Sequence, residues 1–457
     1  MKTILSLVFC LMASAALQAN ISLPAIFTDH MVLQQQSQVS IWGWAKPGEN
    51  IKLVASWDGD TLTTTTDNQS HWSISLSTPA AGGPHQIYLI GHNTIVLSDV
   101  LVGEVWLCSG QSNMEWKPTS GIDNAQAEIE AANFPNIRFF TVDHRTAVDP
   151  QIDLTSTGWQ ACNPQTMKDF SAVAYFFARK IFEETGTPVG LINSSWGGTP
   201  AEAWTPESVY SEDEVLAKSA ALLEEVPWGP VQPGRIFNSM IAPITKFQIA
   251  GAIWYQGESN TSNASTYQHT FSSMIQSWRD LWGYPFPFYF VQIAPFPYGG
   301  DNDHGVRVRD EQRRTLALAQ TGMVVTSDIG DTTDIHPQNK LDVGVRLAHL
   351  ALKHHYKTLS ITVDSPLFSK HTVDKNKVTV YFHNATGLHS ETKKLGDFEL
   401  AGKDGVFHAA KASIKGETVV VQSKQVREPV HVRFAWSNTA IPTLYNQAHL
   451  PASSFSS

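Results

Sequence analysis

A serine in a glycine-flanked turn is the first group in this sequence that could do chemistry. Ser112 lies within residues 109–114, Ser-Gly-Gln-Ser-Asn-Met, soon after an apolar run that ends at Leu107. Glycine permits a tight turn at this point. If the amides after the turn open a helix, they favour developing negative charge. Ser112 is therefore a candidate nucleophile for acyl transfer, which requires a base and hydrogen-bond donors beside it.

The candidate base is His336, which follows several acids in a loop between a predicted strand and a long predicted helix. In a serine hydrolase an acid behind the histidine fixes the tautomer of the ring and stabilises its charged form. We expect this acid to be Asp334, two residues earlier in the chain. Asp331 and a backbone carbonyl are the alternatives.

Three N–H groups could hold the oxyanion of a tetrahedral intermediate. They belong to Ser112 itself, to Gly198 in a Trp-Gly-Gly turn, and to the side chain of Gln256 in a Gln-Gly-Glu-Ser-Asn segment. One such donor is worth about 2.7–4 kcal/mol of transition-state stabilisation. We expect Gln111 and Glu258 to support the site rather than to react.

These segments share one position in the predicted architecture, because each follows a predicted strand. Strands that alternate with helices indicate a parallel sheet with helices on both faces. In such a sheet, ligands bind at the carboxyl ends of the strands. The predicted strands span residues 100–107, 189–193, 249–255, 286–293 and 323–327, and the predicted helices span residues 171–185, 264–281, 309–320 and 340–355.

The flanks of this α/β region have a different pattern. Residues 20–98 contain short alternating runs separated by turn residues, which predict a β-sandwich domain. Residues 358–457 return to β-like segments and form a C-terminal β region, which leaves residues 99–357 for the α/β domain. Residues 1–19 have the basic start, short apolar stretch and small final residues of a secretory signal peptide, which predicts a secreted or periplasmic protein.

Composition and charge limit the classes of partner that the protein could bind. The chain has 457 residues and a formal net charge of −10, which argues against nucleic acid as a partner. No apolar run is long enough to predict a membrane span. No cluster with metal-ligand spacing occurs, so we expect neither metal nor cofactor. Cys108 and Cys162 remain after signal removal, either as a disulfide or as buried thiols.

The motifs together resemble a known family. The chain is similar to sialate O-acetylesterase-type carbohydrate esterases of the SGNH hydrolase superfamily. The resemblance implies a flavodoxin-like SGNH core, Ser112 as nucleophile and His336 as base, with Gly198 and the segment at Gln256 as oxyanion elements. Thr333 departs from the pattern, because many members carry Asp three residues before the histidine. The residues that carry the resemblance are 103–106, 110–115, 195–199, 254–260 and 334–337, with 29–34, 42–43, 435–438 and 444–446 in the flanks.

We therefore predict a secreted serine esterase that removes O-acetyl groups from carbohydrate, foremost from sialic acid. The alternatives are an acetylxylan esterase, a non-catalytic carbohydrate-binding protein, and a glycosidase that pairs Glu258 with an aspartate. Four arginines, Arg307, Arg309, Arg313 and Arg314, either meet a substrate carboxylate or form the solvated start of a helix.

Overall fold

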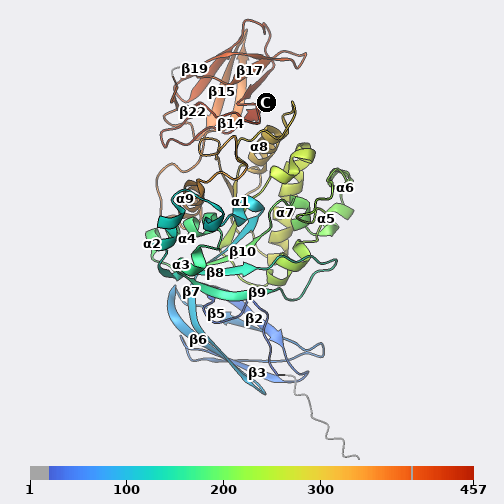
Figure 1. Cartoon of the computed structure of the whole chain (residues 1–457), viewed down its shortest axis with the longest axis vertical. Coiled ribbons are helices and arrows are strands. Elements are labelled where there is room, and N and C mark those ends of the chain that lie inside the picture. The colour runs from blue at the N-terminus through green and yellow to red at the C-terminus, as the bar shows by residue number, and fades with distance from the viewer. Residues whose placement is uncertain (1–19, 393–394) are drawn as a thin grey trace, which may run out of the picture.

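The computed structural model describes residues 20–392 and 395–457. An α/β core occupies the middle of the elongated molecule, with antiparallel β-sheets at both ends (Figure 1). The signal peptide expected at residues 1–19 lies outside the described residues. In the part of the chain described, no helix is long and apolar enough to cross a membrane.

Five parallel strands form the centre of the main sheet, in the spatial order β13-β12-β11-β7-β10. Counted along the chain, these five strands have the doubly wound order 2-1-3-4-5 read from one edge, and the strand Phe134–Val142 adds a sixth parallel strand outside β10. The chain leaves β7 for one side and returns on the other, so a crevice opens beside the end of β7. The strands are β7 (Thr94–Gly110), β10 (Val189–Ser195), β11 (Gly251–Tyr255), β12 (Phe288–Val291) and β13 (Thr321–Val324), extended by β8 (Phe134–Val142) and antiparallel β9 (Ser156–Cys162).

Helices cover both faces of this sheet. In β11, Ala252 and Trp254 belong to one apolar core, whereas Ile253 and Tyr255 belong to the other. Such alternation is expected of a strand buried on both faces. Helices α7 (Tyr267–Trp282) and α8 (His304–Thr315) contribute to the first core, and α4 (Ala172–Thr185) and α9 (Lys340–Leu350) to the second.

Most predicted elements of the core are present, with shifted ends. Helix α8 begins five residues before the predicted start at Arg309, where Asp303 pairs with Arg307 across its first turn. It ends at Thr315, so the prediction that it reaches residue 320 is wrong. The shorter helices are α1 (Ser112–Glu115), α2 (Ala125–Ala131), α3 (Pro164–Met167), α5 (Glu207–Ser211) and α6 (Glu214–Ala220), and a 3₁₀ segment, η5 (Glu258–Thr266), precedes α7.

The N-terminal β region is continuous with the core. A two-stranded sheet of β2 (Gln38–Trp44) and β5 (His71–Ser77) shares an apolar core with strands of the main sheet. Those strands are β1 (Val32–Gln34), β3 (Asn50–Ala55), β4 (Thr61–Thr65), β6 (Gly82–Ile90) and the first half of β7. The boundary expected between residues 98 and 99 falls inside β7, so this strand belongs to both regions.

The C-terminal region has a core of its own. Two four-stranded antiparallel sheets form it, in the orders β14-β15-β20-β19 and β18-β17-β21-β23, with the β16–β22 pair beside them. The strands are β14 (Leu367–Asp374), β15 (Lys377–His383), β16 (His389–Ser390), β17 (Phe398–Ala401), β18 (Phe407–Ala409), β19 (Lys411–Lys415), β20 (Thr418–Gln422), β21 (His431–Phe434), β22 (Leu444–Tyr445) and β23 (Phe455–Ser456).

Cys108 and Cys162 are both buried free thiols, which decides between the two alternatives left by the sequence. Burial raises the pKa of both thiols, that of Cys162 to about 12.

Candidate active site

The turn after β7 presents Ser112. Gly110 ends the strand with a φ of +134°, and a Cβ at this position would lie 2.2 Å from the carbonyl oxygen of Tyr255 on β11. Only glycine fits there, because both the backbone conformation and the close approach exclude a side chain. Helix α1 starts directly afterwards, so Ser112 is its first residue.

His336 reaches this serine from the loop before α9. Its Nε2 lies 2.8 Å from Ser112 Oγ, which is within hydrogen-bond distance. Burial and the nearby charge of Lys340 lower the pKa of His336, and Asp334 only partly opposes this shift. A lowered pKa keeps the imidazole neutral at pH 7, and a neutral imidazole can accept the serine proton.

Asp334 supports His336 through the backbone. Its Oδ1 accepts the main-chain N–H of His336 at 2.8 Å. Among the residues described, the ring of His336 forms a hydrogen bond only with Ser112. The expected contact between Asp334 and the ring is therefore not formed in this structure, because the carboxylate is turned to the main chain.

The alternative acid, Asp331, has other partners. Its carboxylate accepts hydrogen bonds from the backbone and the hydroxyl of Thr333, and among the residues described it forms none with His336. The indole of Trp116 occupies one face of the imidazole, with ring centroids 4.1 Å apart and planes 15° from parallel. Stacking on Trp116 therefore restricts the orientation of the ring, to which no acid forms a hydrogen bond among the residues described.

Two main-chain N–H groups are free to receive an oxyanion. Within the described ranges, the N–H groups of Ser112 and Gly198 donate no hydrogen bond. A Cβ added to Gly197 would lie 3.2 Å from the Cβ of Ser112, so this turn approaches the serine closely. The carboxylate of Glu115 accepts the Gly197 N–H at 2.7 Å and thereby anchors the turn.

Gln256 does not take the role predicted for it. Its side chain is fully buried, and its Nε2 donates to Asn260 Oδ1 at 2.7 Å and to the carbonyl of Thr199 at 3.3 Å. Its Oε1 accepts from the hydroxyl of Tyr267. Both amide protons are thus used away from Ser112, and Gln256 instead fastens the β11 end to neighbouring segments.

Gln111 and Glu258 connect the segments on either side of Ser112, and their supporting role stays a prediction. The side-chain oxygen of Gln111 accepts the N–H groups of Gly257 and Ser259, each at 3.3 Å. Glu258 is buried and accepts from Asn113 Nδ2 at 2.7 Å, and burial raises its pKa. Both contacts join the segment after β11 to the turn that carries Ser112.

Sequence reasoning did not find several residues around this pair. Trp116 and Glu115 follow the serine turn directly, so their position in the chain was an available signal. His144 Nε2 lies 3.2 Å from Glu115, and although burial lowers the pKa of His144, Glu115 raises it overall. Lys340 had no such signal, because a lysine at the start of a helix is usually solvated.

A hollow of about 370 Å³ adjoins the site. Gly198 and Glu258 line it, together with residues of the segment that precedes Gly229. Trp228 covers Gly198, since a Cβ there would lie 2.3 Å from the indole, yet 61% of Trp228 is exposed. This exposed indole lies beside Gly198, one of the two free N–H donors, where its face is open to a substrate ring.

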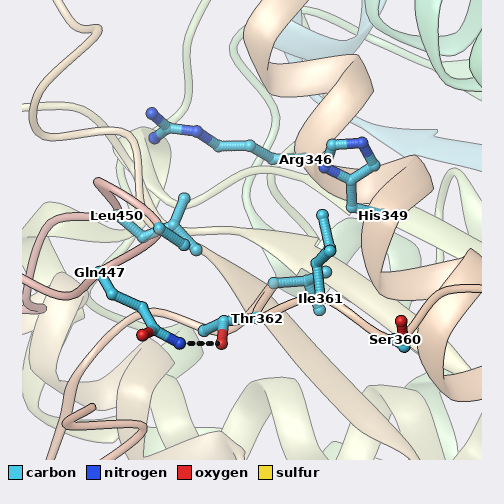
Figure 2. A pocket seen from close by; sticks show the side chains of 9 residues that line it. Arg346, His349, Ser360, Ile361, Thr362, Gln447 and Leu450 are labelled. Carbon is cyan, nitrogen blue, oxygen red and sulfur yellow. Dashed lines mark hydrogen bonds between the residues drawn. The ribbon is translucent and has the colours of Figure 1, made fainter. Parts of the chain in front are cut away.

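A second cavity, of about 500 Å³, lies apart from Ser112. Arg346 and His349 of α9 face Ile361, Thr362, Gln447 and Leu450, and Gln447 donates to Thr362 at 3.3 Å (Figure 2). None of the residues lining this cavity belongs to the candidate site. Likewise, the one group among the described residues that could hold a metal ion, His389, Glu391 and His449, lies in the C-terminal region.

The arginines of α8 have structural partners. Arg309 is fully buried and donates to the carbonyls of Ser437 and Asn438 in the C-terminal region. Arg313 and Arg314 pair with Asp310, and Arg307 pairs with Asp303. Neither expectation for these residues, substrate contact or simple solvation, describes Arg309.

Comparison with known proteins identifies the family of this chain. A family model described as carbohydrate esterase, sialic acid-specific acetylesterase, matches residues 102–353. Human sialate O-acetylesterase is 30% identical over 378 residues, covering 74% of this chain and 72% of that protein. The sialate O-acetylesterase of Pongo abelii is 27% identical, covering 92% of this chain and 88% of that protein.

A solved structure shows the same architecture. A carbohydrate acetylesterase from Xanthomonas citri matches with 37% identity and a TM-score of 0.87, covering 96% of this chain and 99% of that chain. These matches define the protein as a carboxylic ester hydrolase. The chain belongs to the sialic acid-specific acetylesterase family of carbohydrate esterases.

Proposed function

We propose that the protein is a serine esterase that removes O-acetyl groups from carbohydrate, with Ser112 as nucleophile and His336 as general base. One observation carries the assignment: Ser112 Oγ lies 2.8 Å from His336 Nε2, at the carboxyl end of the central strand. Active sites in open parallel sheets lie at that edge, where the order of strands reverses.

The reaction follows from these positions. Ser112 Oγ attacks the acetyl carbonyl carbon while His336 Nε2 takes the hydroxyl proton. The N–H groups of Ser112 and Gly198 receive the charge on the carbonyl oxygen. His336 then returns the proton to the departing sugar oxygen, which leaves an acetyl ester on Ser112. Water activated by His336 hydrolyses that ester and releases acetate.

We propose O-acetylated sialic acid as the first substrate to test. The support is the family and the two sialate O-acetylesterases to which the chain is similar along most of its length. Acetylated xylan-type polysaccharide is the second candidate, because the similar enzyme from Xanthomonas citri is described as a carbohydrate acetylesterase, a class that is not limited to sialic acid. Acetate release from 9-O-acetylated sialic acid and from acetylated xylo-oligosaccharides, compared at equal enzyme concentration, distinguishes the two.

We also propose that the core is of the SGNH, flavodoxin-like type and that the protein acts outside the cytoplasm. The strand order 2-1-3-4-5 supports the first proposal. The second rests on the basic and apolar pattern of residues 1–19. Mass spectrometry of protein recovered from the secreted or periplasmic fraction would test it, with a mature chain beginning near Asn20 expected.

The nucleophile is tested by Ser112→Ala, with Ser120→Ala, an exposed serine of the same segment, as control. Loss of a serine nucleophile typically leaves a small residual activity from binding and the oxyanion donors. We expect Ser112→Ala to lower kcat/KM for p-nitrophenyl acetate by at least about 1,000-fold, and Ser120→Ala to change it less than about twofold. Hydrolysis by Ser112→Ala at the rate of the control would refute the proposal.

A further inference from the structure

Lys340 is a buried cation directly behind the proposed catalytic pair. It is the first residue of α9 and only 1% exposed. Lysine is rarely buried to this degree unless its charge is satisfied by partners. Lys340 Nζ donates to Asn113 Oδ1 at 2.5 Å and lies 5.7 Å from the centre of the Tyr255 ring and 6.0 Å from that of Trp116.

Asn113 connects this cation to both halves of the pair. It is the residue after Ser112, and its Nδ2 donates at 2.7 Å to Glu258 and at 2.9 Å to the carbonyl of Ile335. Ile335 is the residue before His336. One side chain therefore joins the turn of the nucleophile, the loop of the base and the segment after β11.

Few charged side chains act on the imidazole of His336. Lys340 and Asp334 act on the imidazole in opposite directions, while Trp116 and Ser112, which contact the ring, are neutral. Glu258 acts on Lys340, and its second oxygen has no hydrogen-bond partner. Burial lowers the pKa of Lys340 to about 7, so its ammonium form is present in the acidic range where His336 titrates.

We propose that Lys340 is a positioning residue of the esterase: with Glu258 it fixes Asn113 as a bridge that holds Ser112 against His336. This proposal rests on the function proposed above. The bridge locates the histidine loop through the carbonyl of Ile335, whereas an acid behind the histidine would orient the ring and stabilise its charged form. Lys340 also contributes a positive charge that disfavours protonation of the imidazole.

The test compares Lys340→Met with wild type and with Lys180→Met, a lysine of α4 whose pairing with Glu184 lies away from Ser112. Misplacement of reacting groups by about 1 Å can cost on the order of 100-fold in rate. We expect kcat/KM of Lys340→Met for p-nitrophenyl acetate to fall by about 10- to 100-fold. We expect the acid limb of its pH profile to move to higher pH, because a cation that lowers the pKa of His336 is gone.

The double variant Lys340→Met/Glu258→Gln distinguishes a purely structural role of Lys340 from the proposed positioning role. Lys340→Met alone leaves Glu258 buried without a counter-charge, which destabilises the fold. The double variant removes both charges, so its Tm is expected to recover toward wild type. Positioning by Lys340 predicts that kcat/KM stays low and the acid limb stays displaced, whereas recovery of both with the Tm would overturn the proposal.

Rates are divided by the folded fraction from circular dichroism, so loss of folded protein cannot imitate loss of activity. A folded Lys340→Met with the rate and pH profile of Lys180→Met would also overturn the proposal. The parallel Ser112→Ala assay separates the two claims. If Ser112→Ala remains active, the proposed function fails. If it is inactive while the Lys340 variants behave as wild type, only the role of Lys340 fails.

Discussion

At the residue scale, the proposed pair differs from a simple Ser-His-Asp arrangement in what lies behind the histidine. Asp334 holds the main chain of His336, Trp116 stacks on its ring, and Asn113 holds the carbonyl of the preceding residue. Each contact restricts the loop or the ring, and none of the three accepts a hydrogen bond from the imidazole. The base is therefore located by three weak restraints rather than oriented by one carboxylate.

This arrangement predicts a mild phenotype for Asp334→Asn. An asparagine oxygen can still accept the His336 N–H, so the loop keeps its anchor. We expect kcat/KM at pH 7.5 to fall less than about tenfold, whereas loss of a true triad aspartate costs about 10,000-fold. Asp334→Ala, which loses the acceptor, should be the more impaired. A loss of 1,000-fold in the asparagine variant would show that the carboxylate serves the ring during catalysis.

The same variant changes the pH profile in a defined direction. A base must be unprotonated, so kcat/KM falls as pH drops through the pKa of His336, which lies below its ordinary value of 6.5. Asp334 partly opposes that lowering. Its removal should therefore move the acid limb to still lower pH, opposite to the shift expected for Lys340→Met. Stopped-flow or initial-rate measurements from pH 4.5 to 9 check both signs.

At the scale of elements, the sequence predicted the candidate site mainly through the ends of strands. Alternation and apolar runs placed the strands that precede Ser112, Gly198 and Gln256, and the parallel topology brought those ends together. The direction of a side chain at such an end is decided by tertiary hydrogen bonds, which local patterns do not contain. This is why Gln256 was misassigned and why the burial of Lys340 and Arg309 was not anticipated.

Helix ends were the least predictable feature. The predicted start of α8 at Arg309 follows the apolar spacing, but the pair between Asp303 and Arg307 supports an earlier first turn. The length of β7 was missed for a related reason. Its first part pairs with N-terminal strands and its second part with the central sheet, so the change of pattern near residue 99 marks a change of neighbours.

The exposed indole of Trp228 predicts a stacking contact with the sugar of a substrate beside Gly198. An exposed indole can stack on the apolar face of a sugar ring, whereas the small ester p-nitrophenyl acetate does not extend that far. We expect Trp228→Ala to lower kcat/KM for acetylated saccharide by roughly tenfold, equal to about 1.4 kcal/mol, with little change for p-nitrophenyl acetate. Trp228→Phe, which keeps an aromatic face, should retain most of the activity. An equal loss on both substrates would indicate damage to the Gly198 turn instead.

At the scale of the whole molecule, the N-terminal region and the catalytic core are one structural unit. They share β7 and one apolar core, whereas the C-terminal region has a separate core and contacts α8 through Arg309. A shared strand transmits instability from one region to the other. Unfolding of the N-terminal β region is therefore expected to displace Ser112, although Ser112 lies in the α/β core and not in that region.

This coupling can be measured with Leu53→Ala, a fully buried position on β3. Truncation of a buried leucine costs about 2–5 kcal/mol. We expect calorimetry to show a lower Tm for the transition in which esterase activity is lost. Leu400→Ala, the matched substitution in the C-terminal core, should lower a different transition. Coincident shifts in both variants would show that all three regions unfold together.

Cys108 gives this molecule an intrinsic probe. It lies on β7, buried, four residues before the proposed nucleophile, and burial raises its pKa well above the ordinary value. A thiol so protected reacts with an alkylating reagent only when the strand opens, since the thiolate is the reactive form. The rate of alkylation of Cys108 in native buffer, measured by mass spectrometry apart from that of Cys162, therefore records how often the centre of the sheet opens, without any engineered label.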